Sequence, residues 1–81
     1  MAILANPAWN GYAVTASNTV DIPGGPTRAL YIGGAGDVKV KFCNGGAETT
    51  FVAVPVGTLL PLQVIRVFST GTTASNIVAL F

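Results

Sequence analysis

The clearest alternation of apolar and polar positions lies at residues 37–42. Val38, Val40 and Phe42 alternate there with three charged residues, which is the two-residue period of a strand. Such a period places the apolar side chains on one face of the strand and the charged side chains on the other. The pattern therefore predicts a sheet with one buried face and one face in water.

A hairpin is predicted directly after this strand. Asn44 and Gly45 form a pair that readily adopts the positive φ angles of a tight turn. Residues 48–54 are rich in β-branched side chains and predict the return strand. We expect Pro55 to end that strand, because proline cannot donate to a β-ladder.

The charged residues of this hairpin are expected to pair across its two strands. Asp37 and Glu48 should face each other, with Lys39 and Lys41 close enough for ion pairs on a solvated face. This interpretation is favoured over a pair of catalytic carboxylates. The two lysines also form a small basic patch, whose alternative role is contact with an acidic partner.

Shorter apolar stretches, separated by Gly, Pro and Asn, predict further strands at residues 12–16, 19–22, 28–32, 62–68 and 77–81. No uninterrupted window favours a helix. Six or seven short strands indicate an all-β fold, a small antiparallel β-sandwich or barrel over residues 12–81. Residues 1–11 lack this periodicity and predict an extended N-terminal arm.

Glycines 33, 34 and 36 follow one of the predicted strands. A phosphate-binding loop would have to open a helix or carry the lysine of a P-loop, and neither is present here. These glycines therefore predict a tight turn with positive φ angles.

Arg66 is expected to be buried, since strict alternation places it on the same face as Val64 and Phe68. A buried arginine normally needs a partner. That partner is either an intrachain carboxylate, Asp21 or Glu48, or a group on another subunit.

Composition indicates that this chain does not function as an isolated monomer. Of its 81 residues, 51% are apolar and 9% are charged, whereas an average soluble domain is about 25% charged. A domain of this size buries only about 60% of the surface of its unfolded chain. An intrachain disulfide is excluded because Cys43 is the only cysteine, and a zinc site is not expected without histidine. Oligomerisation, or docking on a larger apolar surface, is the remaining means of stabilisation.

The residue content also excludes several classes of function. Without histidine, no Ser–His or Cys–His nucleophilic pair can form, so we predict no enzyme, metal or cofactor. A net charge of +1 excludes a polybasic nucleic-acid binder. No apolar run approaches the roughly 20 residues that span a membrane. The first residues lack the pattern of a secretion signal, and one unpaired cysteine fits synthesis in a reducing cytoplasm.

Trp9, Tyr12 and Tyr31 have two interpretations. They could form a sugar-stacking platform for a host receptor, or they could anchor a protein interface, where aromatic residues are enriched. We favour the interface, because the composition already requires buried contacts.

Three motifs resemble a known family. They are TRALYIGGAGDV at residues 27–38, VGTLLPL at residues 56–62 and RVFSTGTTAS at residues 66–75. In this order, followed by an apolar C-terminal strand, they resemble the small spike-base proteins on the heads of tailed bacteriophages and phage-derived gene transfer agents. The resemblance covers residues 19–81.

The resemblance implies a non-enzymatic structural protein of the virion, made in the host cytoplasm. It would decorate or cement the capsid exterior, or form the base of a head spike or fibre. Implied partners are the major capsid protein, further copies in a homotrimer or homopentamer, and a fibre or spike protein, with neither nucleic acid nor membrane. A glycan-binding module and a tail or baseplate β-subunit are the alternatives. The candidate interface residues are Ile3, Leu4, Trp9, Tyr12, Arg28, Tyr31, Arg66, Phe68 and Phe81.

Overall fold

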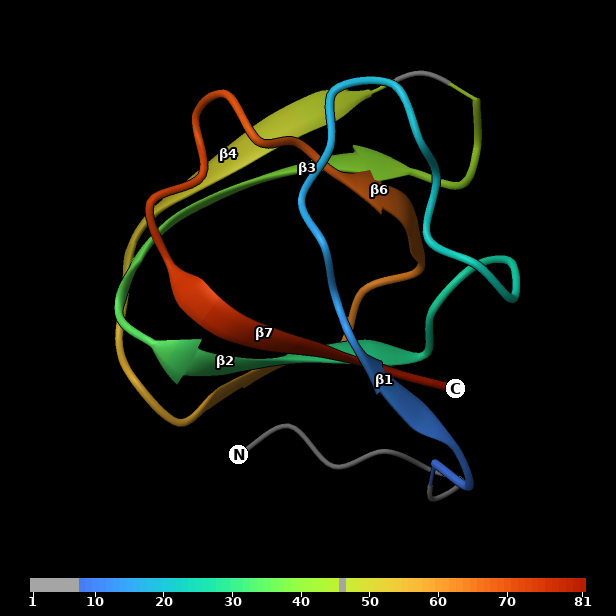
Figure 1. The fold of residues 1–81 in the computed structure, drawn as a ribbon, viewed down its shortest axis with the longest axis horizontal. Coiled ribbons are helices and arrows are strands. Elements are labelled where there is room, and N and C mark those ends of the chain that lie inside the picture. The colour runs from blue at the N-terminus through green and yellow to red at the C-terminus, as the bar shows by residue number, and fades with distance from the viewer. Residues whose placement is uncertain (1–7, 46) are drawn as a thin grey trace.

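The computed structural model describes residues 8–45 and 47–81, which fold into two antiparallel sheets (Figure 1). The four-stranded sheet has the order β1-β7-β2-β5, and the three-stranded sheet has the order β4-β3-β6. These residues contain no helix, so the predicted all-β sandwich is confirmed. The strands are β1 (Gly11–Ala13), β2 (Ala29–Gly34), β3 (Gly36–Phe42), β4 (Glu48–Val54), β5 (Thr58–Leu60), β6 (Val64–Val67) and β7 (Ser75–Leu80).

The hydrophobic core lies between the two sheets. Leu30 and Ile32 of β2 are fully buried, as are Val38 and Val40 of β3. Each belongs to one continuous apolar cluster to which both sheets contribute. Burying an aliphatic side chain of this size stabilises a fold by about 1.5–3 kcal/mol. The core of this small domain therefore depends on a few branched side chains.

The β3–β4 hairpin follows the predicted alternation. The valines of β3 point into the core, and its two lysines are partly exposed. The turn contains Gly45, whose φ angle is 105°. β4 ends at Val54, directly before Pro55, as predicted.

The expected pairing of Asp37 with Glu48 is wrong. Glu48 lies opposite Lys41 in the register, and its carboxylate forms an ion pair with Lys39 Nζ at 3.5 Å. Asp37 lies at the other end of the hairpin, where its Oδ1 accepts a hydrogen bond from the N–H of Ala53 at 2.9 Å. In an antiparallel hairpin the first residues of one strand lie opposite the last residues of the other, which separates these two carboxylates.

β6 is shorter than the predicted strand, and its side chains do not alternate strictly. Val64 and Val67 are both buried. The register between β3 and β6 shifts between Lys41 and Phe42, and an irregularity of this kind changes which side chains point inward. The expectation that Val64 shares a face with Arg66 is therefore wrong.

The glycine-rich stretch is a corner between the sheets rather than a tight turn. Gly33 and Gly34 end β2, and Gly36 begins β3 in the other sheet. A β-carbon on Gly36 would lie 2.6 Å from the backbone N of Ala74, and one on Gly33 would lie 2.7 Å from the backbone O of Asn76. The chain at the start of β7 thus packs too closely for a side chain at this corner.

The chain after β1 crosses from one sheet to the other (Figure 1). Residues 19–22 form no strand, and β1 is shorter than the strand predicted at 12–16. Instead, the N–H of Val14 donates to a carbonyl of β7 and the N–H of Ser17 donates to a carbonyl of β6. These isolated bonds hold the crossing segment against both sheets without extending either ladder.

The expected arm is described only at its end, because residues 1–7 lie outside the described residues. β1 begins at Gly11, and the residues before it are also bonded to the end of the chain. The N–H of Trp9 donates to Phe81 O at 2.9 Å, and the N–H of Phe81 donates to Asn10 O at 2.8 Å. The described end of the arm therefore continues the pairing of β1 with β7.

Candidate interaction surfaces

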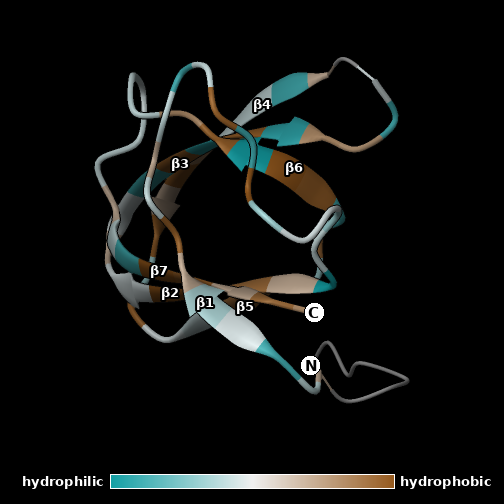
Figure 2. Cartoon of the chain, turned by 45° about the vertical axis from the view of Figure 1, so that its right-hand side comes forward, coloured by the Kyte–Doolittle hydropathy of each residue, from teal (hydrophilic) through white to brown (hydrophobic). Residues whose placement is uncertain are grey.

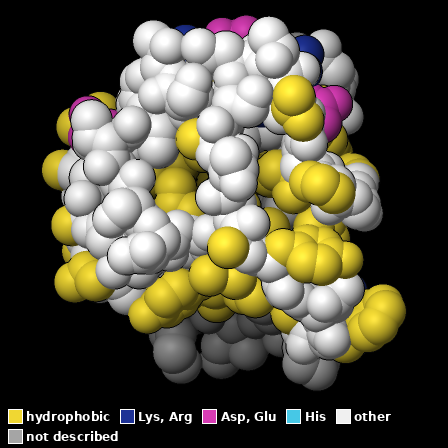
Figure 3. Space-filling model, viewed as in Figure 1, with side chains coloured by type: hydrophobic (Ala, Val, Ile, Leu, Met, Phe, Trp, Pro, Cys, Tyr) yellow, Lys and Arg dark blue, Asp and Glu magenta, His cyan; other side chains and the backbone are white. Residues whose placement is uncertain are grey.

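Charged side chains are segregated to one sheet. No strand of the four-stranded sheet contains a charged residue. Asp21, which lies outside the strands, is joined to the three-stranded sheet by its ion pair with Arg66. Arg28, directly before β2, is the one charged residue of the sequence that is not part of this sheet or joined to it. Figure 2 shows polar colouring on the three-stranded sheet, and Figure 3 shows charged side chains only in the upper part of the view. The charged residues within the three-stranded sheet are Asp37, Lys39, Lys41, Glu48 and Arg66.

The outer side of the four-stranded sheet carries only apolar and aromatic side chains at its central positions. Tyr31 of β2 lies opposite both Val78 of β7 and Leu59 of β5, and Val78 lies opposite Ala13 of β1. Residues directly opposite one another share a face of the sheet. Tyr31 itself is 42% exposed. We refer to these four residues as the uncharged face.

An apolar cleft lies along the segment that crosses between the sheets. Its volume is about 710 Å³, and residues 12–17 and 20–23 line it. Val14 and Ala16 pack against the core from this segment. Val20 also lines the cleft and is 65% exposed. We refer to this feature as the apolar cleft.

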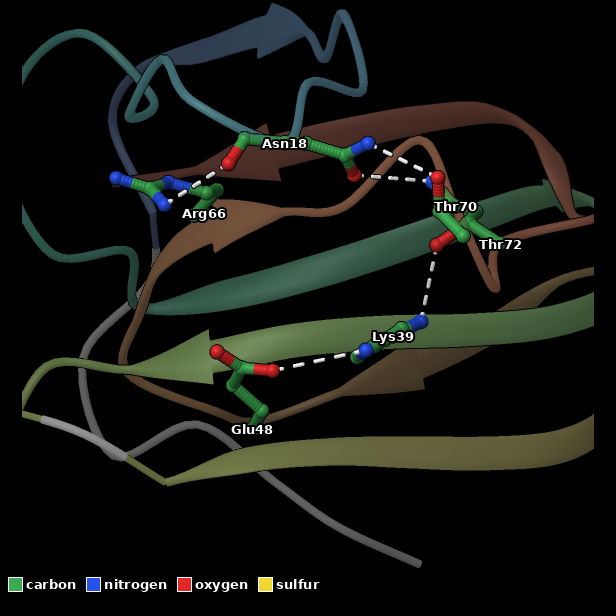
Figure 4. A network of polar contacts seen from close by, with 6 residues as sticks. All are labelled: Asn18, Lys39, Glu48, Arg66, Thr70 and Thr72. Atoms are coloured by element: carbon green, nitrogen blue, oxygen red, sulfur yellow. Dashed lines mark hydrogen bonds and ion pairs between the residues drawn. The ribbon is translucent and has the colours of Figure 1, made fainter.

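A polar network fixes Arg66 within the chain (Figure 4). Its Nε and Nη2 contact Asp21 Oδ1 at 2.8 and 2.7 Å, and its Nη1 donates to Asn18 O at 3.2 Å. The Asn18 side chain donates to Thr70 Oγ1 at 2.9 Å and accepts from the Thr70 N–H at 3.1 Å. Of the alternatives left open by the sequence, the intrachain ion pair is formed, and its carboxylate is that of Asp21 rather than Glu48. The network joins the crossing segment to the TGTT loop at residues 70–73.

Phe68 lies between two cations and is not available at the surface. Lys39 Nζ is 5.1 Å from the ring centroid, and Arg66 Cζ is 5.6 Å from it. Thr72 Oγ1 accepts a hydrogen bond from the N–H of Lys39 at 3.0 Å, which holds the TGTT loop against β3 (Figure 4). The ring is only 7% exposed. Phe68 and Arg66 therefore contact each other, and the loop is held by the bonds of Asn18 to Thr70 and of Lys39 to Thr72.

Three other candidate residues come together at a second, more polar cleft. Trp9, Arg28 and Phe81 line it together with Gln63, and its volume is about 380 Å³. The Trp9 side chain is 83% exposed. The Nε of Arg28 is buried and has no hydrogen-bond partner. We refer to this feature as the Arg28 cleft.

Tyr12 and Tyr31 point to opposite sides of the four-stranded sheet. Tyr12 lies opposite Ala79 and Tyr31 lies opposite Val78, and consecutive residues of a strand point to opposite faces. The ring of Tyr12 instead meets that of Phe81 edge to face, with the centroids 5.3 Å apart. The three aromatic residues considered above as a sugar-stacking platform therefore do not form one surface.

Two candidate interface residues lie outside the described structure, and the sequence analysis did not predict several exposed apolar side chains. Ile3 and Leu4 lie outside the described residues. Val20, Val52 and Val56 are each at least 65% exposed but were not predicted as surface residues. The exposure of Val52 could have been predicted, because it follows Phe51 in the predicted strand and one of two adjacent apolar residues in a strand must point away from the core.

The described residues contain no group of three or more His, Cys, Asp or Glu side chains that could hold a metal ion. Within residues 8–45 and 47–81, no helix has the length and apolar character needed to cross a membrane.

Comparisons with known proteins found similarity to a solved structure. No family model matches the chain, and no curated protein matches it. Among solved structures, it is similar to a chain in the capsid of a native GTA (gene transfer agent) particle, computed with C5 symmetry. The TM-score is 0.83 and the sequence identity is 30%, over 100% of this chain and 92% of that chain. The chain therefore belongs to the same family as this component of a gene transfer agent capsid.

Proposed function

We propose that the chain is a structural protein on the exterior of a phage-like head, where several copies pack on the major capsid protein. It acts there as a decoration (cement) protein or as the base of a spike or fibre. Family membership supports the capsid setting. The observation that carries the mode of action is the segregation of charge, because it leaves one whole sheet suited to burial against protein.

Burial of the uncharged face would drive assembly. Each Å² of apolar surface removed from water contributes about 25 cal/mol before the costs of association. No strand of this sheet introduces a charge that would have to be desolvated. Many copies on one shell would add their weak contacts through avidity.

A closed ring of copies needs two different surfaces on each copy, one for each neighbour. The uncharged face provides one surface, with Tyr31 as its exposed aromatic residue. The apolar cleft provides the other, with Val20 exposed beside it.

The arm at residues 1–11 is proposed to reach a neighbouring subunit, through Ile3 and Leu4. Removing residues 1–7 leaves the bonds of Trp9 and Asn10 to Phe81 in place. We expect this truncation to reduce capsid occupancy while the domain still folds. Unchanged occupancy would contradict the role of the arm.

The experiment for the function itself uses particles that lack the chain. Purified chain is added back, bound copies are counted by quantitative mass spectrometry, and gold-labelled antibody locates them. Label spread over the head supports decoration, label restricted to vertices supports a spike base, and label on tails would instead support the tail or baseplate alternative. Absence of binding to particles would overturn the proposal. A glycan-binding role gains no support from the aromatic residues, since Tyr12 and Tyr31 face opposite ways.

A further inference from the structure

Arg28 and Arg66 have opposite environments. The guanidinium of Arg66 is bonded to Asp21 and to Asn18 O. The Nε of Arg28 is buried without a hydrogen-bond partner, and no ion pair of Arg28 occurs among the described residues. A buried donor left unpaired costs about 1–3 kcal/mol. The charge of Arg28 is therefore not compensated by an acidic side chain of the described residues, and a partner bound at the guanidinium would compensate it.

The surroundings of Arg28 have the form of a binding site. Its backbone N–H donates to Leu80 O at 2.7 Å, which fixes the start of β2. Trp9 and Gln63 line the same cleft as Arg28, so its walls include a flat apolar ring and an amide. Tryptophan and arginine are the residue types that most often carry the binding energy of protein interfaces. The exposure of Trp9, at 83%, leaves its ring free to cover an incoming side chain.

None of the acidic side chains of this chain pairs with Arg28. Asp21 is bonded to Arg66, and Glu48 pairs with Lys39. Asp37 accepts the hydrogen bond of a backbone N–H. These are the three acidic side chains of the sequence. In a second copy the same three carboxylates are engaged in the same way, which favours a carboxylate of a different protein.

We propose that the Arg28 cleft binds an Asp or Glu side chain of the protein on which this chain is seated, with the carboxylate on the guanidinium and the aliphatic part against Trp9. This proposal rests on the proposed function. A guanidinium matches a carboxylate with two parallel hydrogen bonds. A nucleic-acid phosphate backbone is less favoured, because Arg28 is the only lysine or arginine among the described residues that line the cleft, and such backbones are bound by clustered cations.

The binding experiment compares Arg28→Gln with Lys41→Gln on particles that lack the chain. Both substitutions remove one positive charge, and Lys41 forms no ion pair among the described residues and lies on the opposite sheet. We expect Arg28→Gln to weaken particle binding about tenfold or more and to reduce its salt dependence, with Lys41→Gln close to wild type. Thermal unfolding of both variants verifies that they fold. If Arg28→Gln binds as tightly as wild type, or if both variants lose equal affinity, the inference is wrong. If wild type itself does not bind, the proposed function fails instead.

A second experiment tests the chemistry without a partner. The chain contains only two arginines, so ¹⁵N-arginine labelling gives two Nε–H signals in an NMR spectrum. Addition of N-acetylglutamate amide should shift the Arg28 signal and leave that of Arg66 in place, whereas N-acetylglutamine amide should shift neither. A larger response to methyl phosphate than to the carboxylate would overturn the assignment to an acidic protein side chain. Equal shifts of both arginine signals would also overturn it.

Discussion

The carboxylate of Asp37 accepts a hydrogen bond from the backbone N–H of Ala53, across the β3–β4 ladder. Ala53 has a φ angle of 57°, a left-handed conformation that costs a non-glycine residue about 1–2 kcal/mol. The register between the two strands shifts at this place, between Gly36 and Val38. The side chain of Asp37 thus offsets part of the cost of an irregularity that bends the hairpin.

Asp37→Ala should therefore lower the free energy of unfolding by about 1 kcal/mol, because the N–H of Ala53 loses its acceptor. Asp37→Asn keeps a side-chain oxygen that can accept this hydrogen bond, so it should lower the free energy of unfolding by less. Ala53→Gly should raise the free energy of unfolding by up to about 1 kcal/mol, because glycine adopts this φ angle without strain. Urea unfolding measures all three variants. A wild-type midpoint for Asp37→Ala would contradict this account.

The corner glycines allow a matched comparison. A β-carbon on Gly36 would lie 2.6 Å from Ala74 N, whereas one on Gly57 would have nothing within 4 Å. Both residues have positive φ angles, of 154° and 82°. Gly57→Ala should cost only the conformational strain, about 1 kcal/mol, whereas Gly36→Ala should cost more than about 2 kcal/mol through overpacking. Equal destabilisation in denaturant unfolding would show that the close approach of the start of β7 is unimportant.

Arg66 should stabilise the fold through geometry as well as charge. Arg66→Lys keeps the charge but loses the fork that contacts Asp21 and Asn18 together. We expect Arg66→Lys to lower the free energy of unfolding by about 1 kcal/mol. Arg66→Ala should lower it by about 2 kcal/mol, because it also uncovers the Phe68 ring. Calorimetric unfolding at low and high salt measures both variants. If Arg66→Lys is as stable as wild type, the fork contributes nothing.

Head-to-tail assembly can be tested by blocking its two surfaces separately. Tyr31→Lys adds a charge to the uncharged face, and Val20→Lys adds one beside the apolar cleft. Each variant alone should sediment as a monomer, because it lacks one of the two surfaces. A mixture of the two should form dimers only, since one intact surface remains on each. Thr50→Lys on β4 is the matched control and should leave the oligomer intact.

Two results would contradict this arrangement. A variant that keeps the mass of the wild-type oligomer would show that its surface is not used. A mixture that stays monomeric would show that the two surfaces do not contact each other.

The β3–β4 hairpin was predictable because its signals are local. Alternation, the Asn-Gly turn and Pro55 all act within one stretch of chain. β5 was not predicted, since its three residues are too few to show a period. The corner at Gly36 was interpreted as a tight turn because the segment that demands glycine there lies far along the chain, at the start of β7.

How the candidate interface residues group in space was not predictable from the sequence. Arg66 was expected to need a partner, and within the chain the structure identifies Asp21. The proximity of Trp9 to Arg28 arises because β7 lies between β1 and β2 in the sheet, which no local pattern reveals. The burial of Phe68 depends on Lys39 and Arg66, which approach it from two different strands.

Cys43 gives this chain a built-in position for a reporter. It is exposed in the hairpin turn, and its Sγ lies 3.8 Å from Oε1 of Gln63, which lines the Arg28 cleft. Because no other cysteine competes for a maleimide dye, one labelling reaction places a single fluorophore close to that cleft. The emission of such a dye would follow docking in real time, on particles assembled from otherwise unaltered protein.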